Sequence, residues 1–211
     1  MGLRKEHLRF HDHEKLAHYA KAACDIEYLF PFGWGEINGT HNRTDFDLKR
    51  HQEFSNRSME YFDSSTNEKY ISYIIESTYG LDRIFLAILF EALTLEELES
   101  GDTRQLLKIN PFLAPVKANI LPLIKKKHSE KAIAIYNELK KYFMVSYDDA
   151  GNIGKRYRRG DAVGIPFAIT IDNDTLENGS VTVRERDTMK QMTIDAKDLK
   201  NYLAERVNMK N

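Results

Sequence analysis

The segment from Pro31 to Leu48, PFGWGEINGTHNRTDFDL, is the part of the sequence that most constrains the fold. Its glycines at positions 33, 35 and 39 permit positive φ and a close approach of the backbone to a neighbour. Side chains alternate in the run before it, Asp25 to Phe30, which predicts a strand that leads into a tight loop. Glu36 on such a loop could bind a cation or an ammonium group. The alternative is a turn-rich connection in which Glu36 is only solvated.

A second predicted strand, Lys69 to Glu76, ends in a carboxylate on a mostly apolar sheet. Ionised Glu76 would be costly there unless it met a cation or several hydrogen-bond donors, which suggests a ligand. The next segment, Leu81 to Leu93, has the broad apolar face of a helix. Asp82 in its first turn suits the helix dipole, whereas Arg83 opposes it. Arg83 could nevertheless stack on an adenine and pair with phosphate oxygens.

The charge of the chain is unevenly distributed, although its formal net charge is only -1. Lysine and arginine outnumber the acidic residues in residues 111–160, and an RNA partner responds to such local concentration of charge. Tyr157 lies among basic residues in a pattern suited to phosphate contact and base stacking. These residues are Lys155, Arg156, Arg158 and Arg159, with Arg184 and Arg186 as weaker candidates. The alternative is a cationic helix whose side chains pair with Asp148, Asp149 and Asp161.

Apolar spacing predicts an amphipathic helix from Asp12 to Ala23, with Asp12 as its N-cap. Histidines 7, 11, 13 and 18 fall in or before this segment. The only cysteine, Cys24, completes no zinc-like spacing with them, so no metal is predicted. Cys24 itself is interpreted as a small buried apolar side chain. A further helix is expected through residues 48–54, with Asp45 or Asp47 as its cap and a break at Asn56.

The polar, acidic segment Thr94 to Arg104 contains Gly101 and is predicted to separate two domains, residues 1–103 and 104–211. Strands and helices alternate beyond it, which implies an α/β layer with a mixed sheet. The expected strands are 116–121, 143–147, 166–171, 180–186 and 191–194, and the expected helices are 130–142, 152–160 and 196–207.

These segments closely resemble the dimeric-type class II glycyl-tRNA synthetases (glycine–tRNA ligases) of bacteria and eukaryotes. Pro31 to Leu48 is similar to the glycine-recognition segment of the family, and IIESTYGLDRIFLAIL, Ile74 to Leu89, is similar to class II motif 3. APVKANILPL and IGKRYRRGDAVGIPF resemble the anticodon-binding domain. The resemblance covers nearly all of the chain, yet it corresponds only to the C-terminal half of such an enzyme, without motifs 1 and 2.

The resemblance implies an α+β fold, in which part of the antiparallel class II catalytic sheet is followed by an α/β anticodon-binding domain with a mixed sheet. It implies ATP-dependent glycylation of tRNA-Gly through glycyl-adenylate, with Mg²⁺ accompanying ATP. Glu36, Glu76 and Thr78 would bind glycine. Arg83 would bind ATP, and Arg83 and Glu76 would be the catalytic residues. Lys155, Arg156, Arg158 and Arg159 would contact tRNA.

Several positions depart from the family pattern, including Ser77 in place of a common proline and Asn38, Thr40 and His41 in the glycine segment. The expected partners are tRNA-Gly, glycine, ATP and a missing N-terminal half that carries motifs 1 and 2. A homodimer is expected only if motif 1 is supplied. The alternatives are a non-catalytic tRNA-binding fragment and a synthetase-like accessory subunit, such as that of mitochondrial DNA polymerase.

The sequence predicts a cytoplasmic protein. No apolar run approaches the roughly 20 residues of a membrane span, and the N-terminus lacks the apolar core of a signal peptide. A single cysteine excludes an internal disulfide and suits a reducing compartment. The 42% hydrophobic and 30% charged content is ordinary for a soluble globular protein.

Overall fold

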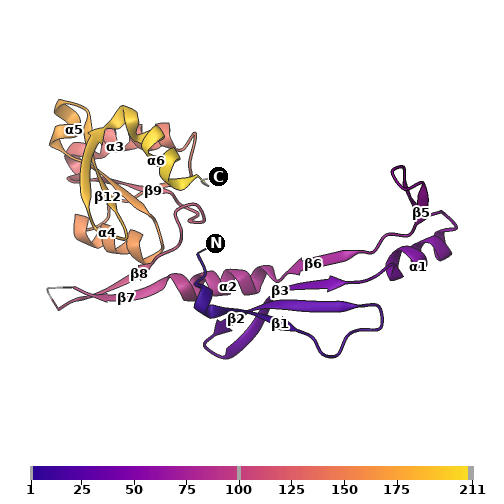
Figure 1. Ribbon diagram of the computed structural model, residues 1–211. Coiled ribbons are helices and arrows are strands. Elements are labelled where there is room, and N and C mark those ends of the chain that lie inside the picture. Colours follow the sequence, from indigo (N-terminus) through magenta and orange to yellow (C-terminus); the bar gives the residue numbers. More distant parts are fainter. Residues whose placement is uncertain (1, 99–100, 209–211) are drawn as a thin grey trace. The chain divides into compact units, whose positions relative to one another are not determined.

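The computed structural model describes residues 2–98 and 101–208. The chain forms two compact units, one of residues 3–87 and one of residues 88–211 with the first two residues. The division falls inside helix α2, Leu81–Ala92, which is labelled in Figure 1. The sequence places the boundary later, after residue 103. α2 itself confirms the helix predicted from Leu81.

The unit of residues 3–87 is built on a four-stranded antiparallel sheet with the order β1-β2-β3-β6. A 3-10 turn, Lys5–His7, precedes the sheet. The strands are β1 Leu8–Asp12, β2 Ala22–Phe30, β3 Gly33–Asn42 and β6 Ile75–Tyr79. β2 contains the strand predicted at residues 25–30, and the antiparallel arrangement is the expected one.

The helix predicted from Asp12 to Ala23 is wrong. Asp12 is the last residue of β1 and pairs with Cys24 of β2, so the two ends of the proposed helix belong to neighbouring strands. The residues between them are largely exposed, so a helix in this segment would bury little of its apolar face. Short helices depend on such packing, and the non-local strand pairing therefore prevails. Cys24 is half-buried, not buried as predicted.

The glycine-rich segment is mostly a strand, not the predicted tight loop. Gly33 has φ +113° and is the only one of the three glycines with positive φ, which allows the sharp turn from β2 into β3. Gly35 and Gly39 continue within β3 and pair with Tyr28 and Asp25 of β2. The pairing shifts register between Ile26 and Glu27, which marks a β-bulge beside Glu36.

A helix and a short hairpin connect β3 to β6. The helix is α1, Phe46–Ser55, and the hairpin strands are β4 Tyr61–Asp63 and β5 Glu68–Tyr70. Asp45 is the N-cap residue of α1, as predicted, although its side chain makes no capping hydrogen bond. The helix ends at Asn56, where the backbone is left-handed. The strand predicted over residues 69–76 is wrong, because β5 ends at Tyr70 and β6 begins only at Ile75.

The C-terminal unit begins with an antiparallel hairpin, β7 Leu93–Glu97 and β8 Thr103–Leu107, in the segment predicted as a boundary. Its main sheet has the order β10-β9-β11-β12-β13. β9 pairs in parallel with β10 and β11, whereas β11, β12 and β13 pair antiparallel, which confirms the mixed sheet. The strands are β9 Ala118–Pro122, β10 Val145–Tyr147, β11 Phe167–Ile171, β12 Ser180–Glu185 and β13 Gln191–Asp195.

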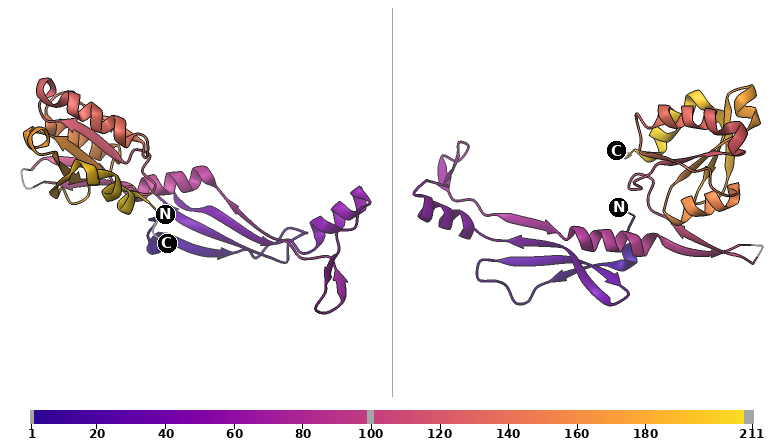
Figure 2. Two further views of the ribbon diagram at one scale, coloured as in Figure 1. Left: turned by 90° about the horizontal axis from the view of Figure 1, so that it is seen from above. Right: turned by 180° about the vertical axis from the view of Figure 1, so that it is seen from behind.

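Four helices accompany this mixed sheet: α3 Lys125–Leu139, α4 Ile153–Ala162, α5 Asn173–Glu177 and α6 Leu199–Val207, with a 3-10 turn Ala196–Asp198 before α6. α3 and α6 cover one face of the sheet and α4 lies on the other (Figures 1 and 2). All five residues of β9 are buried, as expected of a strand covered on both faces. The core includes Ile120, Ile169 and Leu203, which are fully buried. No helix in the described ranges is long and apolar enough to cross a membrane.

Candidate functional site

Two carboxylates converge over Gly39 in the antiparallel sheet. Gly39 pairs with Asp25 on one side and with Thr78 on the other, so these three positions form a row across three strands. A Cβ atom added at Gly39 would lie 3.1 Å from Glu36 Oε1 and 3.2 Å from Asp25 Oδ1. The glycine therefore leaves a small acidic recess that a side chain at this position would fill. Sequence reasoning found Glu36 and missed Asp25, which is only 7% exposed.

Arg83 and Glu36, which are far apart in the sequence, lie side by side. Arg83 Nη1 donates a hydrogen bond of 2.8 Å to the backbone carbonyl of Glu36 and lies 3.7 Å from Glu36 Oε2. The side chains are 57% and 47% exposed, respectively, so both remain accessible to a ligand. The residue predicted to bind ATP and one of those predicted to bind glycine are thus in direct contact.

Glu76 already has a cation as its neighbour. It lies inside β6, opposite His41, and its Oε2 accepts a hydrogen bond of 2.7 Å from Arg43 Nη1. Arg43 also donates to Asp47 through Nε at 2.6 Å, and this hydrogen bond raises the pKa of the guanidinium above its ordinary value. The same contact lowers the pKa of Asp47. Arg43 is therefore the cation that Glu76 was predicted to need. The sequence analysis did not identify Arg43.

Thr78 is joined to β3 by hydrogen bonds. Its Oγ1 donates to the carbonyl of Gly39 at 3.4 Å, while Asn38 Nδ2 donates to the carbonyl of Thr78 at 2.7 Å. Asn38 Nδ2 also donates to Ser77 Oγ at 3.1 Å. Side chains alternate along a strand, so Thr78 and Glu76 lie on one face of β6 and Ser77 lies on the other. Asn38 and Ser77, which depart from the family pattern, thus stabilise the β3–β6 register behind the recess.

The histidines of the N-terminal segment gather beside Asp25. His13 Nε2 lies 2.7 Å from Asp25 Oδ2, and the His11 and His13 rings are 5.3 Å apart. The His41 ring lies 6.5 Å from that of His13. Within residues 2–98 and 101–208, no group of histidine, cysteine and acidic side chains has the arrangement of a metal site. The direct contact of His13 gives it a role in orienting the carboxylate of Asp25.

The predicted tRNA residues of α4 differ in accessibility. Lys155 is exposed, and its backbone N–H donates to the side chain of the N-cap residue Asn152 at 2.9 Å. Arg158 is half exposed and pairs with Asp102 at 3.1 Å. Arg159 is also half exposed and pairs with Asp148 at 2.6 Å. The alternative interpretation, in which cations of α4 pair with Asp148, Asp149 and Asp161, is therefore correct for Arg159. Arg158 and Arg159 nevertheless both remain on the surface.

Arg156 is buried, so in this structure its side chain cannot contact a phosphate of a bound RNA. Only 3% of it is exposed. Its Nη1 donates to the carbonyl of Pro122 at 2.5 Å, and its Nη2 donates to the carbonyl of Gly151 at 2.6 Å. We correct its predicted role from RNA contact to a structural link between two loops.

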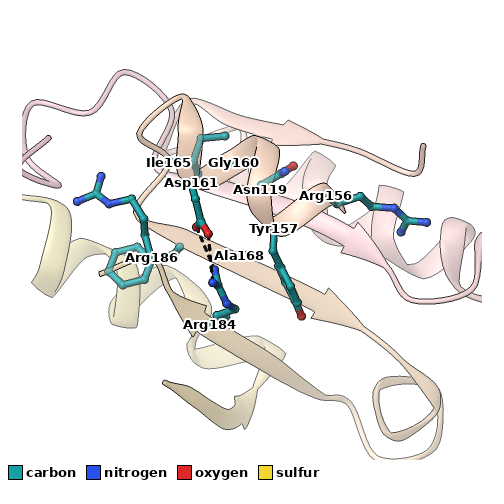
Figure 3. Close-up of a pocket in the computed structure, with 10 residues that line it drawn as sticks. Asn119, Arg156, Tyr157, Gly160, Asp161, Ile165, Ala168, Arg184 and Arg186 are labelled. Carbon is teal, nitrogen blue, oxygen red and sulfur yellow. Dashed lines mark hydrogen bonds and ion pairs between the residues drawn. The ribbon is translucent and has the colours of Figure 1, made fainter. Parts of the chain in front are cut away.

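A buried charge network lies on the other side of α4 (Figure 3). Asp161 accepts two hydrogen bonds from Arg184, of 3.0 and 3.1 Å, and Figure 3 shows this pair with Tyr157 beside it. Arg104 Nε also donates to Asp161 at 3.0 Å, and Arg104 Nη1 donates to Glu96 at 3.0 Å. The adjoining cavity measures about 10 Å³, enough for roughly one water molecule. This network fixes α4 to β8 and β12.

Arg184 and Arg186, the weaker tRNA candidates, are both buried. Arg186 donates to the carbonyls of Gly164 and Ile109, at 2.8 Å each, and pairs with Asp187 at 2.7 Å. A guanidinium satisfied by backbone carbonyls in this way stabilises the local fold. The structure therefore assigns both arginines to the interior of the unit and corrects the sequence-based role.

Comparison with known proteins shows what the chain is similar to. Residues 112–206 match the family model described as an anticodon binding domain. The chain is 53% identical to a glycine–tRNA ligase of Clostridium tetani and 51% identical to that of Clostridium acetobutylicum, each over 209 residues. The chain is homologous to part of the glycine–tRNA ligases. The ligase of Geobacillus kaustophilus is 50% identical over the same length.

The homologous region covers 98% of this chain but only 45% of each of these ligases. The chain thus spans less than half the length of the curated relatives. The predicted resemblance to glycine–tRNA ligases over part of their length is confirmed, as is the anticodon-binding domain. This domain lies within the C-terminal compact unit.

Proposed function

We propose that the chain is the C-terminal part of a glycine–tRNA ligase, which joins glycine to tRNA-Gly in two steps. The glycine carboxylate attacks the α-phosphorus of ATP and pyrophosphate leaves; a hydroxyl of the terminal tRNA ribose then attacks the glycyl carbonyl of the adenylate, and AMP leaves. The observation that carries this proposal is the convergence of Glu36 and Asp25 over Gly39. The similarity to glycine–tRNA ligases supports it.

The recess over Gly39 is suited to an ammonium group with no attached side chain. Glu36 Oε1 and Asp25 Oδ1 both lie close to Gly39, so an ammonium group that rests against the glycine backbone would be able to donate a charge-assisted hydrogen bond to each. A larger amino acid would need the space that the packed strands occupy, so selection works by steric exclusion. Glu36 and Asp25 bind the ammonium in this proposal, and Thr78 borders the recess from β6.

Glu76 and Arg83 are the proposed catalytic residues. Arg83 is exposed beside Glu36, so a guanidinium that pairs with ATP phosphates would lie next to the bound glycine. ATP would arrive with Mg²⁺ as part of the substrate complex. Glu76 acts from the same sheet and is held by Arg43 in this structure. Positioning and electrostatic stabilisation of the developing charge supply the catalysis.

The sheet of residues 3–87 has apolar surface that calls for a covering partner. Large apolar side chains are exposed on β1, on β6 and on α2, and so many of them on one small unit favour contact with a partner. They include Phe10, Ile75, Tyr79, Leu81 and Phe85. We assign this role to a polypeptide that corresponds to the part of the related ligases outside the matched region. That part would carry motifs 1 and 2. A homodimer would form through that motif 1.

The C-terminal unit is the proposed tRNA-Gly binding part, with Lys155, Arg158 and Arg159 available on α4. The cytoplasm, where translation takes place, is the proposed location. The anticodon-domain match by itself also favours a second function, that of a non-catalytic tRNA-binding module.

A chimaera distinguishes the two functions. The segment of the Clostridium tetani ligase that matches this chain is replaced by residues 1–211, and glycine-dependent ATP–pyrophosphate exchange and tRNA glycylation are measured. We expect both activities. A folded chimaera that binds tRNA-Gly without exchange would overturn the ligase assignment and leave the tRNA-binding module.

Gly39→Ala in this chimaera tests the recess itself. The added methyl would lie 3.1 to 3.2 Å from two carboxylate oxygens, closer than ordinary van der Waals contact. We expect the KM for glycine in the exchange reaction to rise at least tenfold, about 1.4 kcal/mol, with little change in the KM for ATP. Gly154→Ala, where the added Cβ would lie at an ordinary 3.6 Å from Asn152 Oδ1, is the control for a glycine substitution outside the site. An unchanged KM for glycine would contradict the assignment of the recess.

A further inference from the structure

The recess over Gly39 is bordered by a histidine as well as by two carboxylates. A Cβ atom added at Gly39 would lie 3.6 Å from His41 Cε1, in addition to its contacts with Glu36 and Asp25. His41 follows Gly39 by two residues in β3, so the two positions lie on one face of the strand. His41 is half-buried and is one of the positions that depart from the family pattern. An imidazole therefore stands next to the place proposed for the ammonium group.

A second histidine lies behind Asp25. The two oxygens of the Asp25 carboxylate have different neighbours, because Oδ1 faces Gly39 while Oδ2 lies 2.7 Å from His13 Nε2. A carboxylate at this distance accepts the N–H of the imidazole, so Nε2 carries a proton. The His13 side chain is 37% exposed and can exchange protons with water, whereas Asp25 is buried. The contact holds one oxygen of Asp25 and leaves the other turned toward the recess.

His13 and His41 approach each other across β2. His41 pairs with Ala23, and the backbone N–H of His13 donates to the carbonyl of Ala23 at 3.0 Å. Ala23 has a small side chain, which leaves the space above β2 to the two imidazoles. Their ring centroids are 6.5 Å apart. One histidine therefore reaches the recess from β3 and the other from the segment after β1.

The acids on this face of the sheet have different cations as partners. Three arginine–glutamate pairs are present: Arg9 with Glu27, Arg43 with Glu76 and Arg83 with Glu36. The imidazole of His11 also approaches Glu27, at 3.5 Å. Asp25 differs, because its partner is His13, which is charged only when it is protonated. The charge beside Asp25 therefore depends on pH, whereas an arginine keeps its charge.

Protonation of either histidine opposes the binding of an ammonium group in the recess. Protonated His13 forms an ion pair with Asp25 and neutralises the charge that attracts the ammonium. Protonated His41 places a positive charge beside the recess, where it repels the ammonium. When both histidines are neutral, the two carboxylates of the recess act on the ammonium with their full charge.

We propose that His13 and His41 belong to the ammonium site, and that this site binds an amino acid only while both imidazoles are neutral. His13 is a positioning residue for Asp25, and His41 borders the ammonium directly. The inference rests on the proposed function and adds the groups that regulate its glycine site. Histidines change charge between about pH 5 and 8, so glycine binding weakens as the pH falls through this range. By linkage, bound glycine displaces protons from the two histidines.

The test follows the KM for glycine in ATP–pyrophosphate exchange by the chimaera as the pH is lowered. We expect this KM to rise about tenfold from about pH 8 to about pH 6, because each histidine opposes the ammonium once it is protonated. His41→Gln cannot become charged and should reduce the rise to about threefold. His11→Gln is the control, because His11 lies on the same sheet face but beside Glu27. It should leave the tenfold rise unchanged.

Two substitutions of His13 separate positioning from a purely structural role. His13→Gln keeps an N–H donor for Asp25 but cannot become charged. At about pH 8 it should leave the KM for glycine within about threefold of the unmodified value, and its rise toward low pH should be smaller. His13→Ala leaves Asp25 without this donor and should raise the KM severalfold even at about pH 8, with kcat unchanged in both variants. A structural role would change kcat and leave the pH dependence as it is.

The outcomes distinguish this inference from the proposed function. If the unmodified chimaera catalyses exchange and both glutamine variants keep its full pH dependence, the two histidines do not belong to the site and the ligase assignment stands. If the unmodified chimaera is folded and catalyses no exchange, the ligase assignment fails and the inference fails with it. Thermal unfolding checks that each variant is folded.

Discussion

The two compact units differ in how completely they bury their own apolar side chains. The C-terminal unit has a continuous core that joins β9, β11 and β12 with α3 and α6. The sheet of residues 3–87 has few buried apolar side chains, while aromatic and aliphatic residues on its strands and on α1, β4 and α2 are exposed. The second unit has the layers of a self-sufficient domain, whereas the sparse core of the first unit is what we expect if another polypeptide completes it, as proposed above.

The largest expected effect is on the ion networks. Asp161→Ala would leave Arg184 buried without a carboxylate and Arg104 with Glu96 as its remaining carboxylate, which costs about 3–5 kcal/mol of unfolding free energy. Asp47→Ala removes one of the two carboxylate partners of Arg43 in the other unit, where Glu76 remains and the pair is partly exposed, and should cost far less. Urea unfolding monitored separately for each unit measures both. An equal loss of unfolding free energy in the two variants would contradict the difference between the two units.

A smaller effect is expected in the apolar cores. Leu203→Ala creates a cavity in the C-terminal core and should cost about 2–5 kcal/mol. Phe54→Ala, on the exposed surface of α1, should change stability by less than about 0.5 kcal/mol in the chain alone. Thermal unfolding of the two variants provides the comparison. If Phe54→Ala proved as destabilising as Leu203→Ala, the first unit would have a core that the structure does not show.

The smallest expected effect is a pH dependence at low pH. Hydrogen bonding to Lys125 lowers the pKa of Asp149 in the C-terminal unit, and hydrogen bonding to Arg43 lowers that of Asp47 in the first unit. A lowered folded-state pKa stabilises the fold above the unfolded value of about 3.9, and this contribution is lost as pH falls through the folded pKa. Asp149→Asn should reduce the loss of unfolding free energy at low pH in the C-terminal unit and leave the pH dependence of the first unit unchanged. Urea titrations between about pH 2 and 6 measure this pH dependence for each unit. A weaker pH dependence in both units would contradict independent unfolding.

Patterns within single elements were predictable from the sequence. The apolar face of α2 gave a helix whose predicted start, Leu81, is the observed one. The strand predicted over residues 116–121 overlaps β9, and all five residues of β9 are buried, the polar Asn119 included. The alternation of such segments gave the mixed sheet. These features depend on local periodicity, which a sequence displays directly.

Cross-strand relations were not predictable in the same way. Residues 12–23 have helical spacing, but the pairing of β1 with β2 decides their structure, and that pairing joins positions far apart in the chain. Asp25 belongs to the candidate site only because it lies opposite Gly39. A row of basic residues likewise does not reveal that Arg156 turns inward to two backbone carbonyls while Arg159 stays on the surface.

Hydrogen–deuterium exchange on the intact chain tests the contrast between the units most directly. Amides of β9 and β11 should exchange only through global unfolding of the C-terminal unit, while those of β2 and β3 should exchange at least tenfold faster through local opening. Adding the N-terminal segment of the Clostridium tetani ligase should slow β2 and β3 and leave β9 and β11 unchanged. Equal protection of the two sheets in the chain alone would contradict an incomplete first unit that another polypeptide completes.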